Sequence, residues 1–151
     1  MRPLHTKLAI FLLIGLFAGC TSSQTKESRD RENSHLRWIV KLYLHASQGH
    51  APKNEREFKQ FISGIDPAIR DRTLAAAEVK SMDELFISER DGLPYVILYS
   101  PPPKGVASGV IAYEQQGTEG ERYIGYTKGI IEKVDEQQFD TLVPKAARSM
   151  K

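Results

Sequence analysis

Cys20 is the only cysteine in the 151-residue chain, and its thiol is the clearest candidate for chemistry in the sequence. One cysteine cannot form an internal disulfide, so a lone thiol in an exported chain needs another explanation. Met1–Lys7 carries two basic residues and no acid, and the ten residues Leu8–Phe17 have no polar side chain. Such a run is too short to cross a bilayer, which takes about 20 residues, but it is typical of the apolar core of a signal peptide.

The stretch Leu16-Phe17-Ala18-Gly19-Cys20 resembles the lipobox of bacterial lipoproteins, although Phe17 stands where leucine is more usual. The resemblance implies cleavage between Gly19 and Cys20, diacylglycerol on the Cys20 sulfur and often a further acyl chain on the new amino group. Two lipid chains make attachment stable where one chain is marginal. The alternatives are ordinary secretory cleavage nearby, with Cys20 incidental, and a retained transmembrane anchor.

The segment after this cysteine, Thr21–Asn33, has no apolar residue and cannot bury enough surface to offset its ordering entropy. We expect a flexible tether, and a random coil of these 13 residues spans about 20 Å. The predicted organisation is a cleaved signal peptide at 1–19, the lipidated cysteine and tether at 20–33, and a globular domain at 34–151. By resemblance to enterobacterial sorting rules, Thr21 in place of aspartate favours the outer membrane over the inner membrane.

The charge balance argues against a nucleic-acid partner. The chain has 21 basic and 19 acidic residues, and the predicted signal peptide contains two of the basic residues and none of the acidic ones. Cleavage therefore leaves equal numbers of each. An excess of positive charge is the expected signature of a nucleic-acid-binding surface, and the mature chain lacks it.

The first half of the domain has the periodicity of helices. The apolar residues of the first predicted helix, Ser34–Gly49, recur at helical spacing: Leu36, Ile39, Val40, Tyr43 and Leu44. Asn54 and Glu57 form a plausible capping box for a second helix. Asp66-Pro67 begins a third helix, which we expect to run to about Ala77.

The second half has the pattern of strands. We expect the following strands and turns along the chain: Leu85–Glu89 and Pro94–Tyr99 around an Asp91-Gly92 turn, a loop at Ser100–Gly105, then Val110–Glu114, Glu121–Thr127 and Ile130–Val134. Asp135 with Gln138 caps a last helix, which ends before Pro144. The fold class predicted is α+β, with N-terminal helices packed on an antiparallel meander of about five strands and a short C-terminal helix.

This layout resembles the globular part of type IV pilin-like and pseudopilin-like proteins. The residues that carry the resemblance are the first helix, the Gly49-His50-Ala51-Pro52 junction and the Arg90-Asp91-Gly92-Leu93-Pro94-Tyr95 segment. The resemblance implies a helix lying across a sheet of three to five antiparallel strands. A lipobox and a polar linker replace the hydrophobic half-helix of pilins, and Tyr126–Gly129 replaces an acidic calcium loop. The resemblance therefore predicts the fold of the domain and does not predict assembly into filaments.

No set of residues predicts a catalytic, cofactor or metal site. His35, His45 and His50 do not have metal-motif spacing, and Ser108 lacks the flanking glycines of a hydrolase elbow. Asp83-Glu84 is explained by a turn after Ser81. The acids Glu114, Glu119 and Glu121 flank a hairpin loop, where solvated acids are common.

Five tyrosines fall on predicted strands and are candidate surface contacts for a protein or glycan: Tyr95, Tyr99, Tyr113, Tyr123 and Tyr126. The preference of tyrosine for strands explains them equally well. The run Pro101–Pro103 is either a polyproline ligand or a rigid connector.

The sequence favours a non-enzymatic envelope lipoprotein that is held on a membrane by lipid at Cys20 and contacts another protein or the cell wall. One alternative is an envelope enzyme with a site built from strand-loop acids and histidines. The other is an accessory factor of pilus or secretion assembly. A deep pocket with two or more convergent ionisable groups would favour the enzyme, whereas a shallow apolar or tyrosine-lined surface would favour the binding protein.

Overall fold

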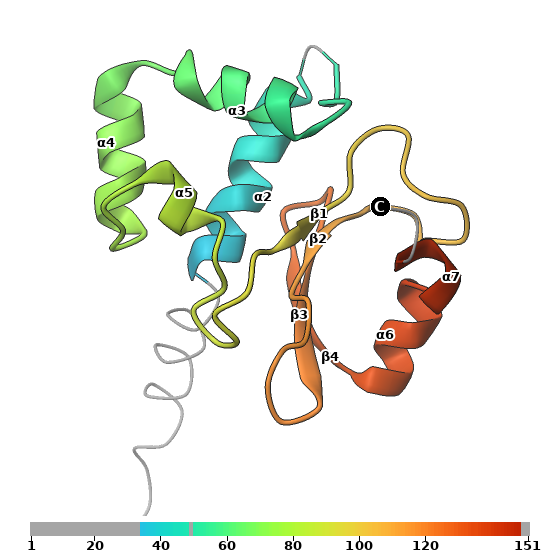
Figure 1. Ribbon diagram of the computed structural model, residues 1–151. Helices are drawn as coiled ribbons and strands as arrows, with labels where there is room; N and C mark the ends of the chain where they lie inside the picture. The colour runs from blue at the N-terminus through green and yellow to red at the C-terminus, as the bar shows by residue number, and fades with distance from the viewer. Residues whose placement is uncertain (1–33, 49, 149–151) are drawn as a thin grey trace, which may run out of the picture.

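The computed structural model describes residues 34–48 and 50–148, so the predicted cleavage at Gly19, the lipid on Cys20 and the tether lie outside the described residues. Figure 1 shows helices at both ends of the described chain and a sheet between them. The helices are α2 (Ser34–Ala46), α3 (Glu55–Ser63), α4 (Pro67–Ala76), α5 (Met82–Leu85), α6 (Glu136–Leu142) and α7 (Lys145–Arg148). The strands are β1 (Val96–Ile97), β2 (Val110–Tyr113), β3 (Glu121–Tyr126) and β4 (Ile131–Asp135).

The sheet is an antiparallel meander in the order β1-β2-β3-β4, which confirms the α+β class with helices before the sheet and a short helix after it. The described sheet has four strands, and the predicted strand at Leu85–Glu89 is wrong. Leu85 ends α5, and beyond it only Ile87 forms an isolated bridge, with Pro94. The reason is local, because the Ser81 side chain accepts the Glu84 N–H and starts a helical turn.

The helix starts follow the predicted caps. Asn54 Oδ1 accepts the Glu57 N–H at 2.9 Å, while the Glu57 carboxylate accepts the N–H of Lys53, one residue before the cap. Asp66 accepts the Ala68 N–H at 2.8 Å, with Pro67 in the first turn. Asp135 and Gln138 form a complete capping box. These side chains satisfy amide groups that a helix end leaves unpaired.

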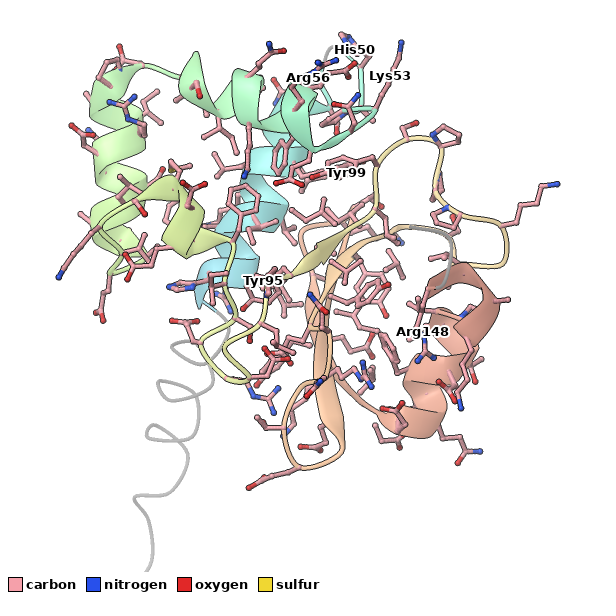
Figure 2. All side chains as sticks on the ribbon, viewed as in Figure 1. His50, Lys53, Arg56, Tyr95, Tyr99 and Arg148 are labelled. Carbon is pink, nitrogen blue, oxygen red and sulfur yellow. The ribbon has the colours of Figure 1, made fainter. Side chains whose placement is uncertain are left out.

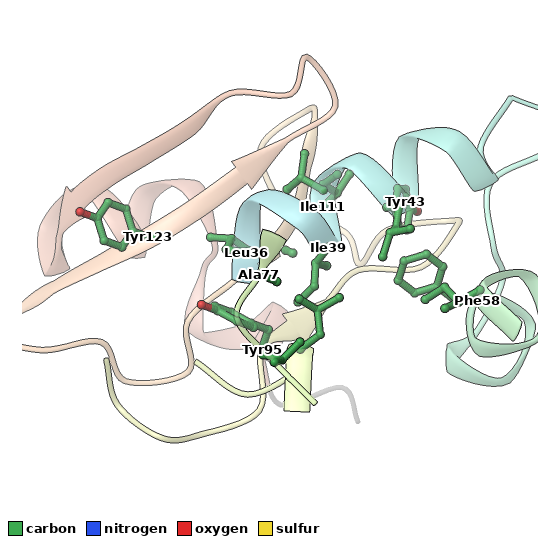
Figure 3. Close-up of a cluster of buried hydrophobic side chains, with 14 residues drawn as sticks. Leu36, Ile39, Tyr43, Phe58, Ala77, Tyr95, Ile111 and Tyr123 are labelled. Atoms are coloured by element: carbon green, nitrogen blue, oxygen red, sulfur yellow. The ribbon is translucent and has the colours of Figure 1, made fainter. Parts of the chain in front are cut away.

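Helix α2 packs on one face of the sheet, where a hydrophobic cluster joins it to α3 and α5 (Figure 3). The labelled members of this cluster are Leu36, Ile39, Tyr43, Phe58, Ala77, Tyr95, Ile111 and Tyr123. The helix crosses β3 at Gly125, where an added Cβ would lie 2.4 Å from Val40 Cγ2. A glycine at this position is therefore what permits the close approach of α2 to the sheet.

The opposite face of the sheet is also covered, by α6 and the chain that follows it. A second hydrophobic cluster fills this layer: Leu98, Val110, Tyr113, Ile124, Val134, Phe139 and Val143. The rings of Tyr113 and Phe139 meet edge to face at 5.2 Å. Because both faces are covered, β2 is buried at all of its positions, and β1 lies between two helical layers.

Candidate binding groove beside strand β1

A groove of about 650 Å³ follows β1, which is an edge strand of the sheet. The segment Pro94–Pro101 runs along it. One wall comes from Lys53 and Glu55 at the start of α3 and from Phe86 after α5, and the other comes from Ala147 and Arg148 of α7. Figure 2 shows Lys53 and Arg148 well apart, with Tyr99 between them in the view.

Only part of the backbone of β1 is hydrogen-bonded to β2. Leu98 donates its N–H to the Ile111 carbonyl at 2.8 Å, and Val96 is paired with Tyr113 in the same register. Hydrogen-bonding directions alternate along a strand, so the N–H and C=O of Ile97 point away from β2. Within residues 34–48 and 50–148, no backbone group pairs with them. The edge of the sheet at Ile97 therefore has one backbone donor and one acceptor without a backbone partner in the part of the chain that the structure describes.

Three hydrogen bonds hold this edge in place. The buried hydroxyl of Tyr43 donates to the Leu98 carbonyl at 3.0 Å. The Tyr95 N–H donates to the Phe86 carbonyl at 2.9 Å, and the Ser100 N–H donates to the Pro52 carbonyl at 3.0 Å. The edge is thus fixed to the helical layer at both ends, and burial of the Tyr43 hydroxyl raises its pKa.

Lys53 and Glu55 line the groove with Tyr99, whereas His50 and Arg56 lie outside its lining. In the view of Figure 2, His50, Lys53 and Arg56 lie above Tyr99. All three are exposed, and among the described residues none has a carboxylate partner within salt-bridge distance. Two acids lie beside these residues. Glu55 pairs with Lys59 at 2.9 Å, and its hydrogen bond raises the pKa of Lys59, while the Glu57 carboxylate accepts the backbone N–H of Lys53.

The charge on the opposite wall is satisfied within the protein. The guanidinium of Arg148 pairs with Asp140 and also donates to the Val143 carbonyl at 2.8 Å. The hydrogen bond from Arg148 lowers the pKa of the Asp140 carboxyl. Arg148 also lies over the buried Phe139 ring at 4.5 Å, so these contacts fix its side chain on this wall.

A buried ionic cluster lies at the start of the same segment. Glu114 is 0% exposed and receives hydrogen bonds from Arg90 at 2.8 Å, from the Ser88 hydroxyl at 3.1 Å and from the Tyr123 N–H at 2.8 Å. Burial raises the pKa of Glu114, although the Tyr123 amide and the Arg90 guanidinium both favour the charged form. Arg90 also lies 4.8 Å above the Tyr123 ring.

Asp91 ties the adjacent turn to the β2–β3 loop. Its carboxylate accepts the N–H groups of Leu93 at 3.1 Å, Gln116 at 3.1 Å and Gly117 at 2.8 Å. Partial burial opposes its ionisation, but these backbone donors together lower the pKa of Asp91 below its ordinary value. Asp91 and Glu114 therefore lock residues 88–94 onto the second hairpin, and neither side chain lines the groove.

The histidines occupy separate environments. His35 is buried, with Nδ1 2.7 Å from the Ile87 carbonyl and Nε2 3.6 Å from Glu89. His45 meets the Phe61 ring edge to face at 5.4 Å, and His50 is exposed. In the part of the chain that the structure describes, no three histidines, cysteines or acids are placed to hold a metal ion.

The remaining candidate residues also have structural contacts or open surroundings. Asp83 lies 3.5 Å from Lys59, and Glu84 accepts the Lys80 N–H at 2.8 Å. Glu121 pairs with Lys133 at 2.5 Å across the β3–β4 pair. Ser108 and Glu119 are exposed in loops.

The five tyrosines do not form one surface. Tyr95, Tyr113 and Tyr123 are 6%, 4% and 2% exposed, so the prediction that they make surface contacts is wrong and the structural alternative holds for them. Their rings contribute to the clusters on both faces of the sheet, because alternate strand residues point to opposite faces. Tyr99 and Tyr126 are partly exposed, and of these two Tyr99 lines the groove.

Sequence reasoning missed the Arg90–Glu114 pair and the cationic residues Lys53, Arg56 and Arg148. A charged residue beside a predicted turn gives no local signal of burial, and the partners of Arg90 are 24 and 28 positions away. The groove likewise joins the start of α3, β1 and α7, which are far apart in the chain. The one usable signal was Tyr99, the last residue of a predicted strand.

No protein-family model, curated protein or solved structure matches this chain. The resemblance to pilin-like domains therefore stays a prediction. Within the described residues, no helix has the length and apolar composition needed to cross a membrane.

Proposed function

We propose that this chain is a lipid-anchored protein of the cell envelope whose domain binds another protein and catalyses no reaction. The observation that carries the proposal is the groove beside β1, where the backbone N–H and C=O of Ile97 have no backbone partner within residues 34–48 and 50–148. Exposed strand edges attract additional strands unless a protein protects them. Strand β1 is only two residues long and lies between Pro94 and Pro101, so the backbone left open at this edge is short.

The contacts of the candidate catalytic residues support binding over catalysis. Glu114 is fully buried against Arg90, and His35 is buried against Ile87 and Glu89. Neither residue lines the groove. The charged residues that do line it are Lys53 and Glu55 on one wall and Arg148 on the other, and Glu55 and Arg148 have partners in the protein. A general acid and base must both reach one substrate atom, and this arrangement does not favour that.

The anchor is proposed from the sequence, with the outer membrane favoured over the inner membrane. The test compares the full chain with its Cys20→Ala variant by mature mass and by membrane fractionation. We expect the added mass of diacylglycerol on the wild-type chain and release of the variant from the membrane. A wild-type chain without lipid, or a variant that fractionates unchanged, overturns the anchor.

The binding function is tested in cells by photo-crosslinking. A photoreactive phenylalanine analogue replaces Tyr99 in the groove or, as the matched control, Lys128 in the exposed β3–β4 turn. We expect a discrete protein adduct from position 99 and none from position 128. Absence of any adduct from position 99 under conditions where the chain is made and folded contradicts the proposal.

A further inference from the structure

We draw no further inference here: the strongest candidate, the cleft of about 340 Å³ between α3, α4 and α5, has its cations Lys59 and Arg70 already paired with acids of the protein, and nothing in the structure shows what covers it.

Discussion

Residues 88–94 and residues 95–101 differ in how their polar groups are hydrogen-bonded. In residues 88–94, Ser88, Arg90 and Asp91 are all engaged with the second hairpin through Glu114, Gln116 and Gly117. In residues 95–101, the backbone N–H groups of Tyr95, Leu98 and Ser100 are hydrogen-bonded. The N–H and C=O of Ile97 border the groove and have no backbone partner among the described residues. Residues 88–94 therefore attach the segment to the second hairpin, whereas residues 95–101 border the groove.

This comparison shows how an edge strand of only two residues can keep a fixed position beside a groove. Such a short strand cannot keep its position by ladder hydrogen bonds alone. The buried cluster fixes the chain immediately before it, and Tyr43 fixes Leu98 from the helical side. Substitutions in residues 88–94 should therefore change stability, whereas substitutions beside residues 95–101 should change binding.

Arg90→Ala should cause the largest loss of stability. It leaves the fully buried Glu114 carboxylate without its cation, and breaking a buried pair in this way costs about 3–5 kcal/mol. Urea unfolding followed by circular dichroism measures the change. The matched control is Lys133→Ala, which removes a partly exposed pair with Glu121 and should cost less than about 1 kcal/mol. Equal losses in the two variants would contradict the role given to the buried cluster.

Asp91→Ala should have the next largest effect. It removes the acceptor for three backbone N–H groups that join the turn to the β2–β3 loop. We expect a loss of about 1–3 kcal/mol in the same unfolding measurement, since the donors lose a charged partner. Amide exchange of Gln116 and Gly117 should accelerate in the variant, and unchanged exchange at both would argue against this tie.

Glu114→Gln should change how stability depends on pH. The folded-state pKa of Glu114 is raised above its ordinary value of 4.5, so its contribution is fully present below pH 4.5 and is lost as pH rises through the raised pKa. The difference in unfolding free energy between the wild type and the variant should therefore fall as pH increases above 4.5. The lowered pKa of Asp91 has the opposite effect, because its contribution to stability is lost as pH falls below 3.8. This contribution cancels in the comparison because the wild type and the variant both contain Asp91.

The smallest effect on stability is expected for Lys53→Glu combined with Arg56→Glu. Both side chains are exposed and have no ion partner among the described residues, so the unfolding free energy should move by less than about 1 kcal/mol. The crosslink from position 99 should nevertheless weaken, because Lys53 and Tyr99 line the same groove. A large loss of stability with an unchanged crosslink would contradict the conclusion that residues beside 95–101 affect binding and not stability.

Much of the fold could be predicted from the sequence because its signals are local. The caps at Asn54, Asp66 and Asp135 each act within three residues, and all three begin helices where expected. The alternation of apolar residues and the turn signals gave β2, β3 and β4 and their antiparallel order. The strand expected at Leu85–Glu89 failed because the Ser81 cap and the helical turn that follows it outweigh the β preference of Phe86 and Ile87.

The candidate site could be predicted only in part, because its members come from three regions of the chain. Tyr99 was recognised as a possible contact, but the same predicted strand, Pro94–Tyr99, also contains the buried Tyr95. Which of these tyrosines meets solvent depends on the loop and helices packed around β1. The position of α7 as the second wall also carried no signal in its four residues.

The sequence by itself therefore determined the α+β class, the helix starts and the prediction of a lipid anchor at Cys20, since each depends on residues that are neighbours in the chain. Only the tertiary structure decided that Glu114 is paired with Arg90, that Gly125 admits α2 against the sheet, and that Ile97 faces a groove. These features depend on distance in space between segments that are remote in sequence, and burial and charge pairing are set by that distance.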